Sequence, residues 1–311
     1  MATQDKSDKD GGPGILRKPL PWWLRYFAPY PVAYDRLRSL IRYRPFDPAC
    51  DLDPKQPGYL ADTLQTGRMF IPSFSSLNDP WEAAPSLENY PWRRDLHTDI
   101  ADFLSDLAPE VSSPESREKL LSDTRFFGTE ALLRKTQQVL MDEFRGSPIL
   151  SMSDRGDNFL MWSYYGQGHS GFAFVFDARV LPFAFAVRVR YKKKHPRIFL
   201  TRKDRSGLAM DILATKARQW KHEREWRILP TKDRATKLGF NAFENASEKG
   251  FYGTVPISSI IGVIIGDHLY RGLHSQALLD LLPQHDSTMK FWLAEIDRRK
   301  YRIVLRPITF T

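Results

Sequence analysis

The stretch from Ile149 to Asp177 constrains the fold more than any other part of this chain, because its small, polar and aromatic residues lie between two apolar runs. Residues 148–153 alternate apolar and small polar side chains, as a strand leaving the core does. Residues 172–176 form a second run, dense in phenylalanine, which is also typical of a strand. The stretch therefore predicts two strands that bracket a short polar and aromatic connection.

That connection predicts a short helix from Asn158 to Tyr165. Asp154 and Asp157 precede the helix, and either carboxylate can accept the free backbone N–H groups of its first turn. Glycines at positions 166 and 168 follow, and glycine readily takes the positive φ at which helices end. The helix would bring aromatic side chains close to the ends of both strands.

Three residues of the connection are candidate ligand contacts: Trp162, Tyr165 and His169. Trp162 and Tyr165 are also expected as core residues, since they are spaced as on one helix face. His169 follows a glycine in a loop, where polar residues serve function more often than packing. The sequence supports both interpretations.

Composition describes a globular protein of 311 residues, 42% hydrophobic and 27% charged, enough for one large domain or two small ones. No apolar run approaches the ~18 residues that a transmembrane helix needs, and the polar N-terminus lacks the apolar centre of a signal peptide. We therefore expect no membrane contact and a cytoplasmic location. The single cysteine, Cys50, forms no internal disulfide and no zinc motif, so no metal site is expected.

A net charge of +9 favours encounters with polyanions such as nucleic acid or anionic cofactors. Basic residues crowd between Arg188 and Arg205, with Tyr191 and Phe199 among them. A charge run of this kind is often a solvated face. Basic residues with interleaved aromatics also form phosphate-binding surfaces, so RNA or DNA is a candidate partner through this segment.

The chain divides into three parts by composition. Residues 1–14 are polar, charged and glycine-rich, and we expect them to be disordered. Residues 15–38 place aromatics among prolines, and we expect them to pack against the domain or a partner. Residues 39–311 form the predicted single domain, in which residues from about 92 to 145 show helical periodicity and no catalytic signature.

Alternating side chains predict further strands and helices. A strand at residues 39–44 would place Arg42 and Arg44 on the same face. The other predicted strands are residues 68–74, 185–191, 221–229, 253–257, 260–266, 291–296 and 301–307, and the other predicted helices are residues 58–67, 211–220 and 276–282.

Five polar residues come within ten positions at the end of the strand predicted at 68–74: Ser73, Ser75, Asn78, Asp79 and Glu82. Serine, asparagine and aspartate hydrogen-bond the backbone of their own turn, so a capped turn explains them. A ligand site explains them equally well.

The strand predicted at residues 221–229 would hold Glu223 and Glu225 on one face, two residues apart. Carboxylates that close repel one another, which raises the pKa of one of them unless a cation intervenes. Such an arrangement is costly without a function. The alternative is a surface strand whose Glu and Arg side chains pair with neighbours for little net energy.

The order of several motifs resembles the bacterial domain-of-unknown-function family 2971. The resemblance spans roughly residues 41–307, and it rests on Tyr43-Arg44, Asn78-Asp79-Pro80-Trp81-Glu82, Ser151-x-Ser153, Met161-Trp162-x-x-Tyr165-Gly166-x-x-His169-x-Gly171-Phe172 and Trp220-x-x-Glu223-x-Glu225-Trp226-Arg227. The resemblance implies a shared fold and carries no settled activity.

A second set of residues is similar to the pattern of ADP-ribosyltransferases, whose split sheet carries an Arg or His early, a Ser, Thr or Tyr element in the middle and a Glu, often as E-x-E, late. The matching residues are Arg42 or Arg44, then Ser151 and Ser153 or Ser73 and Ser75, then Glu223 and Glu225. The resemblance implies NAD as substrate, with a cation on its pyrophosphate and aromatic and polar contacts to nicotinamide. It further implies that Glu225 stabilises the ribosyl cation as nicotinamide leaves.

We therefore predict an α+β domain with an ADP-ribosyltransferase-like split mixed or antiparallel sheet and an inserted helical segment. The predicted function is ADP-ribosyl transfer from NAD to a macromolecular or nucleic-acid acceptor, or NAD cleavage. The alternatives are a non-enzymatic nucleic-acid-binding module and an RNA-processing nuclease that uses His169 and a glutamate as acid and base. If there is one site, Arg44, Ser73, Trp162, Tyr165 and Glu225 should line a common cleft.

Overall fold

The computed structural model describes residues 33, 36–53, 58–88, 95–107, 122, 129–200, 205–230, 234–247, 249–282 and 288–309. The predictions for residues 1–14, and for nearly all of residues 15–38, lie outside this part of the chain. Within it, no helix is both long enough and apolar enough to cross a membrane.

The fold is built on an eight-stranded mixed sheet, with strand order β15-β14-β13-β5-β1-β4-β10-β6. Neighbouring strands run antiparallel except for β13 and β14, which are parallel. The bounds are β1 (Ser39–Arg44), β4 (Leu150–Ser153), β5 (Phe172–Asp177), β6 (Val187–Arg188), β10 (Glu225–Ile228), β13 (Ile260–Gly266), β14 (Lys290–Asp297) and β15 (Arg302–Ile308). Helices and a mixed sheet confirm the predicted mixed α and β architecture.

Three small sheets accompany the large one. An antiparallel sheet joins β2 (Arg68–Pro72), β12 (Gly250–Thr254) and β11 (Ala242–Ser247). Two parallel pairs join β3 (Ser86–Glu88) to β8 (Arg197–Phe199) and β7 (Arg190–Lys192) to β9 (Thr215–Ala217). The last pair fixes the position of the candidate site, because it sets Tyr191 opposite Lys216.

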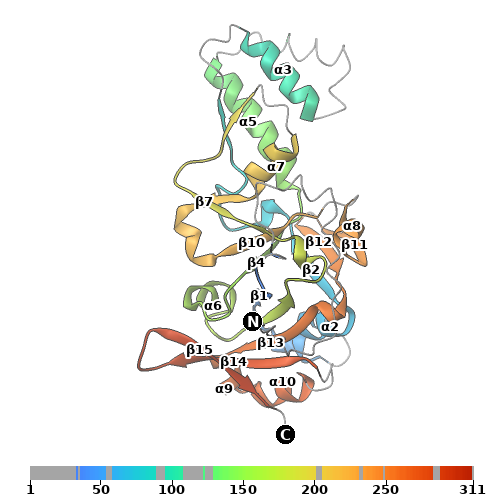
Figure 1. Ribbon diagram of the computed structural model, residues 1–311, viewed down its shortest axis with the longest axis vertical. Coiled ribbons are helices and arrows are strands. Elements are labelled where there is room, and N and C mark those ends of the chain that lie inside the picture. Colours follow the sequence, from blue (N-terminus) through green and yellow to red (C-terminus); the bar gives the residue numbers. More distant parts are fainter. Residues whose placement is uncertain are drawn as a thin grey trace, which may run out of the picture.

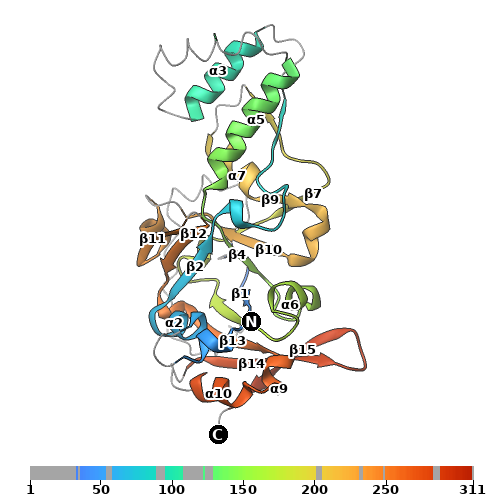
Figure 2. The same cartoon turned by 180° about the vertical axis from the view of Figure 1, so that it is seen from behind.

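The molecule is elongated, and a pair of helices lies at each of its ends (Figures 1 and 2). At one end lie α3 (Leu96–Leu107) and α5 (Thr129–Arg145), which confirm helices inside residues 92–145. At the other end α9 (Asp267–Arg271) and α10 (Ser275–Leu281) lie beside β14. Other helices are α1 (Pro48–Asp51), α2 (Tyr59–Thr66), α6 (Phe159–Tyr165), α7 (Arg205–Leu213) and α8 (Ala235–Leu238).

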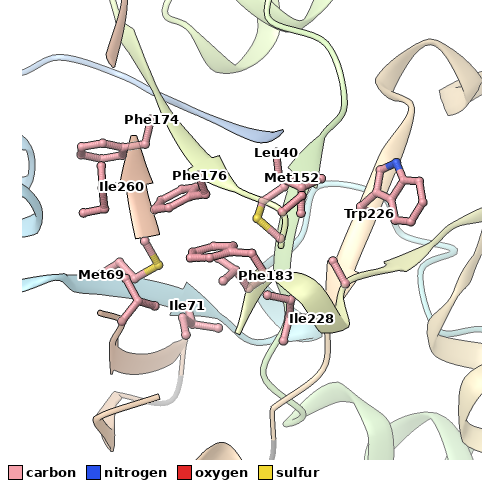
Figure 3. Close-up of a cluster of buried hydrophobic side chains, with 14 of the residues drawn as sticks. Leu40, Met69, Ile71, Met152, Phe174, Phe176, Phe183, Trp226, Ile228 and Ile260 are labelled. Atoms are coloured by element: carbon pink, nitrogen blue, oxygen red, sulfur yellow. The ribbon is translucent and has the colours of Figure 1, made fainter. Parts of the chain in front are cut away.

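The two faces of the large sheet have different cores. Alternate residues of a strand point to opposite faces, so Phe172, Phe174 and Phe176 of β5 share one face with Leu40 and Trp226, and the main core forms there (Figure 3). The opposite face carries a smaller core around α6, with these members: Ile41, Tyr43, Met161, Trp162, Ala173, Val175, Ile264, Ala294 and Ile303.

This alternation separates two groups of predicted site residues. Glu225 pairs with Ser153, and Ser153 pairs with Ile41, so Glu225 lies on the face that α6 covers. Arg42 pairs with Phe174 and therefore points to the main-core face. Arg44 follows it on that face. The sheet stands between the two arginines and the glutamate.

The region from 205 to 229 differs from its prediction. The helix predicted at 211–220 is wrong, since α7 ends at Leu213 and β9 and the 3-10 helix η6 (Arg218–Glu223) follow. The strand predicted at 221–229 begins only at Glu225, because Arg224 takes a left-handed conformation with φ of 49° and turns the chain. Glu223 is therefore not a strand residue, and its approach to Glu225 has a different cause.

Four other predictions need smaller corrections. The strand predicted at 253–257 lies earlier, since β12 ends at Thr254 and the 3-10 helix η7 (Ile257–Ser259) follows. The strand predicted at 185–191 is interrupted into the 3-10 helix η5 (Phe183–Phe185), β6 and β7. Helix α6 is capped by Asn158, whose side chain accepts the N–H groups of residues 160 and 161, and not by Asp154 or Asp157. The strand predicted at 68–74 ends at Pro72, and the 3-10 helix η3 (Phe74–Ser76) follows.

Candidate functional site

Five ionisable side chains meet in the interior on the α6 side of the large sheet: Glu82, Lys216, Glu223, Glu225 and Arg227. We call them the charged cluster. At most 6% of any of these side chains is exposed. Charges this deep are stable only when they are paired and hydrogen-bonded, so the geometry of the pairing decides what the cluster can do.

Arg227 is the centre of the pairing. Its Nε donates to Glu225 Oε1 at 2.8 Å, and its Nη2 donates to Glu225 Oε2 at 2.9 Å and to Glu82 Oε1 at 2.7 Å. Its Nη1 donates to the carbonyl oxygen of Leu213 at 2.6 Å. The guanidinium therefore clamps both oxygens of Glu225 and ties β10 to the end of α7.

Lys216 holds the other side of the cluster. Its Nζ donates to Glu223 Oε2 at 2.6 Å and to Glu225 Oε2 at 3.3 Å, and it lies 3.6 Å from Glu82 Oε2. The second oxygen of Glu223 accepts from the Tyr165 hydroxyl at 2.6 Å. Lys216 is thus the cation that brings Glu223 and Glu225 together, although the two glutamates do not share a strand.

Burial and pairing set the pKa values of the cluster. Burial raises the pKa of Glu225, but Arg227 and Lys216 outweigh it and lower this pKa to about 2. For Glu82, burial outweighs Arg227 and Lys216, so its pKa is raised. Burial would lower the pKa values of Lys216 and Arg227, and the neighbouring carboxylates raise both well above their usual range. Three carboxylates face two cations, and burial makes the Glu82 carboxyl easier to protonate than an ordinary glutamate.

A pocket of about 370 Å³ adjoins the cluster. Lys216 belongs to both, since it also lines this pocket. The other lining residues are Trp81, Ala84, Lys192, Lys193, Lys194, His195, Pro196, Ile212, Thr215, Ala217, Gln219 and Trp220. We call it the lysine–tryptophan pocket, because it combines four lysines with two tryptophans.

Contacts with the charged cluster and its neighbours position the two tryptophans of this pocket. Trp81 is 64% exposed, and its backbone N–H donates to Asp79 Oδ1 at 3.0 Å. The next residue, Glu82, is anchored to Arg227. Trp220 lies on η6, with its ring centre 5.1 Å from Lys216 Nζ. Such a lining can bind an aromatic group and an anion together.

Arg42 and Arg44 lie on the other face of the sheet, where they hydrogen-bond to backbone carbonyls and a tyrosine hydroxyl. Arg42 donates to the carbonyl oxygens of Ser151 at 2.9 Å and Phe70 at 3.0 Å. Arg44 donates to the Phe70 carbonyl at 2.9 Å and to the Tyr59 hydroxyl at 2.7 Å. Burial, followed by the charge of Arg44, lowers the pKa of Arg42 to about 10. The structure therefore does not bring either arginine to Glu225.

The serine pairs differ in their positions. Ser73 and Ser75 share a hydroxyl–hydroxyl hydrogen bond of 2.8 Å, and Ser73 also donates to the carbonyl of Lys249, which agrees with a capped turn. Ser153 is fully buried and donates to the carbonyl of Glu223 at 2.7 Å. Ser151 lies opposite Arg227 in the strand register. The Ser151–Ser153 pair is thus the one beside the charged cluster.

Trp162 and His169 form a separate aromatic group. Trp162 is fully buried, and its indole N–H donates to the Gly156 carbonyl at 2.8 Å, so it is a core residue. The His169 ring stacks on Trp162 and also contacts Phe159 and His268. His169 has a positive φ of 71°, and burial, with His268 adding to it, lowers its pKa. Of Trp162, Tyr165 and His169, only Tyr165 donates a hydrogen bond to a carboxylate of the charged cluster.

Three members of the cluster, Glu82, Lys216 and Arg227, were not among the predicted catalytic or cofactor-binding residues, and Arg227 appeared only in the family motif. Glu82 carried a signal, because it ends the polar turn, but nothing local connects it to Arg227, 145 positions away. Lys216 carried none, since it lay inside a predicted helix. Among the described residues, no group of three or more His, Cys, Asp or Glu side chains could hold a metal ion.

Comparison with known proteins gives one match. A family model described as a protein of unknown function (DUF2971) matches residues 161–228. Comparisons with curated proteins and with solved structures gave no match. The matched residues include Tyr165, Lys216, Glu223, Glu225 and Arg227, which are all but one of the residues that hold the cluster together. The resemblance predicted from the motif order is confirmed for residues 161–228, which are similar to that family.

Proposed function

We propose that the lysine–tryptophan pocket binds a nucleotide, and that the nucleotide is NAD, which the protein cleaves or uses for ADP-ribosyl transfer. One observation carries the proposal: Lys216 lines the pocket and, on its other side, binds the carboxylates of Glu223 and Glu225. A nucleotide in the pocket would therefore have carboxylates one side chain away.

The lining of the pocket suits the two halves of a nucleotide. Tryptophan faces stack with bases, and lysines neutralise phosphates. A volume of about 370 Å³ lies within the usual range for small-molecule sites. The cation role that the sequence pattern gave to Arg42 or Arg44 passes in this proposal to Lys192, Lys193 and Lys194, because they face the pocket.

The reaction needs a negative group near the ribose. When the bond from ribose to nicotinamide breaks, its electron pair leaves with the nicotinamide nitrogen, and the ribose carbon becomes cationic. Water or an acceptor group then bonds to that carbon and loses a proton. A preorganised carboxylate stabilises the transient positive charge.

Within this proposal, Glu223 fits that role better than Glu225. Arg227 clamps both oxygens of Glu225, so most of its charge is already compensated. Glu223 is bound by one lysine and one tyrosine, and it ends the helix η6 that supplies Gln219 and Trp220 to the pocket. An ADP-ribosyltransferase-like arrangement is part of the same proposal, with Ser153 as the middle element because it supports Glu223.

Titration calorimetry with NAD tests the binding step. Trp220→Ala should weaken NAD binding by about tenfold or more, since base stacking on an aromatic side chain contributes roughly 1–3 kcal/mol. Lys300→Ala, an exposed lysine in the turn between β14 and β15, is the matched surface control and should bind like the wild type. Absence of NAD binding by the wild-type protein would refute the proposal.

A further inference from the structure

A second hollow lies next to the lysine–tryptophan pocket. It has a volume of about 500 Å³ and is lined by Arg188, Val189, Arg190, Tyr191, Lys192, Lys193, Arg218 and Lys221. We call it the arginine groove. Lys192 and Lys193 line the pocket as well as the groove, so the two hollows adjoin.

The groove gathers positive charge from separate elements. Arg188 lies on β6, Lys192 ends β7, and Arg218 begins η6. These three side chains are exposed, as are Lys193 and Lys221. Arg190 is paired with Asp211, and no acidic residue is among the lining residues of the groove. Five exposed cations therefore line one concave surface.

The fold brings these cations together, because they come from elements that are separate in the sequence. Strand β7 pairs with β9, and Tyr191 of β7 accepts the backbone N–H of Glu225 at 2.7 Å. Helix η6 is held by the Ser153 hydroxyl at its last residue. The cations thus project from backbone elements that are tied to the charged cluster.

We infer that the arginine groove binds the phosphodiester backbone of a single-stranded nucleic acid. A row of cations tracks such a backbone, and exposed aromatic faces beside it stack unpaired bases. Trp81, which lines the adjoining pocket and is 64% exposed, supplies such a face. A duplex hides its base faces, so the combination selects single strands.

The inference deepens the proposed function by naming the acceptor as nucleic acid, and it rests on that function only for the transfer step. Binding to the groove requires no NAD. Nucleic-acid binding without NAD, measured separately from NAD binding, therefore distinguishes a failure of this inference from a failure of the proposed function.

The test is fluorescence anisotropy of a labelled 12-nucleotide single strand, in DNA and RNA forms, over a series of salt concentrations. Each phosphate contact lowers the slope of log affinity against log salt by about 0.7 for single strands. The double variant R218A/K221A should weaken binding by roughly tenfold at low salt and make the slope shallower by about 1.4.

Two controls make the result specific. Lys300→Ala removes an exposed lysine that does not line the groove and should leave affinity and slope unchanged. Trp81→Ala should lower affinity by about fivefold or more without changing the slope, since stacking is not ionic. The inference is overturned if R218A/K221A behaves like Lys300→Ala, if a duplex of equal length or inorganic polyphosphate binds more tightly, or if no single strand binds.

Discussion

Arg227 shows why this site is difficult to change one residue at a time. Its side chain is completely buried, and it makes four hydrogen bonds to three partners, Glu225, Glu82 and the Leu213 carbonyl. Removing one partner of a buried ion pair leaves a charge without compensation, which costs more than the pair contributes. Structural and chemical roles of these glutamates must therefore be measured separately.

Glu225→Gln should lower the free energy of unfolding by about 3 kcal/mol, because Arg227 loses the carboxylate charge and one of the two oxygens to which its Nε and Nη2 donate. Denaturant unfolding measures the change. The matched control is Glu244→Gln, where the glutamate is 64% exposed, and its effect should stay within about 0.5 kcal/mol. Equal stability of the two variants would show that the clamp contributes nothing.

His169 should make stability depend on pH. Its pKa is lowered in the folded state, so the unfolded chain binds a proton more readily. The contribution of neutral His169 to the free energy of unfolding is complete above the unfolded pKa of about 6.5. It is lost as pH falls through that value toward the folded pKa. Denaturant unfolding at pH 7.5 and 5.5 should show a larger loss for the wild type than for His169→Asn, which tolerates the positive φ and does not titrate. The same loss of stability in the wild type and in His169→Asn would contradict this prediction. The control is His195→Asn, at an exposed position, which should behave like the wild type.

At the scale of elements, the sequence predicts what local patterning controls. The strands at 39–44 and 172–176 and the helix ending at Tyr165 carry clear periodicity, and the structure contains all three. Residues 214–224 carry no clear periodicity. The 3-10 helix η6 is stabilised by remote groups, the Ser153 hydroxyl and the Asn158 side chain, so no local pattern reveals it.

Asn158 allows η6 to be tested apart from α6. Its side-chain oxygen caps α6, and its Nδ2 donates to the His222 carbonyl of η6. Asn158→Ala removes both contacts and should lower the free energy of unfolding by about 2 kcal/mol. Asn158→Asp keeps the cap and loses the donor, so it should cost less than Asn158→Ala but still weaken NAD binding measured by calorimetry. Unchanged NAD affinity in both variants would show that the position of η6 does not affect NAD binding.

At the scale of the whole molecule, the site is assembled by contacts between distant segments. Glu82 lies 145 positions from Arg227, and Tyr165 lies 58 positions from Glu223. The sequence indicated Glu223, Glu225, Tyr165 and the serine pair at 151 and 153, and the structure brings these together. It could not indicate that the sheet separates Arg42 and Arg44 from them, because that depends on which face of β1 the main core covers.

Nicotinamide release from NAD by Glu223→Gln tests the central claim most directly. The substitution keeps the size of the side chain and an acceptor for Tyr165, and it removes the charge that would stabilise the ribosyl cation. We expect NAD affinity close to that of the wild type and a lower melting temperature, because Lys216 loses one buried charged partner. At a temperature where both proteins are folded, nicotinamide release should be slower by about 100-fold or more. Wild-type release by Glu223→Gln, or no release by the wild-type protein itself, would contradict the account.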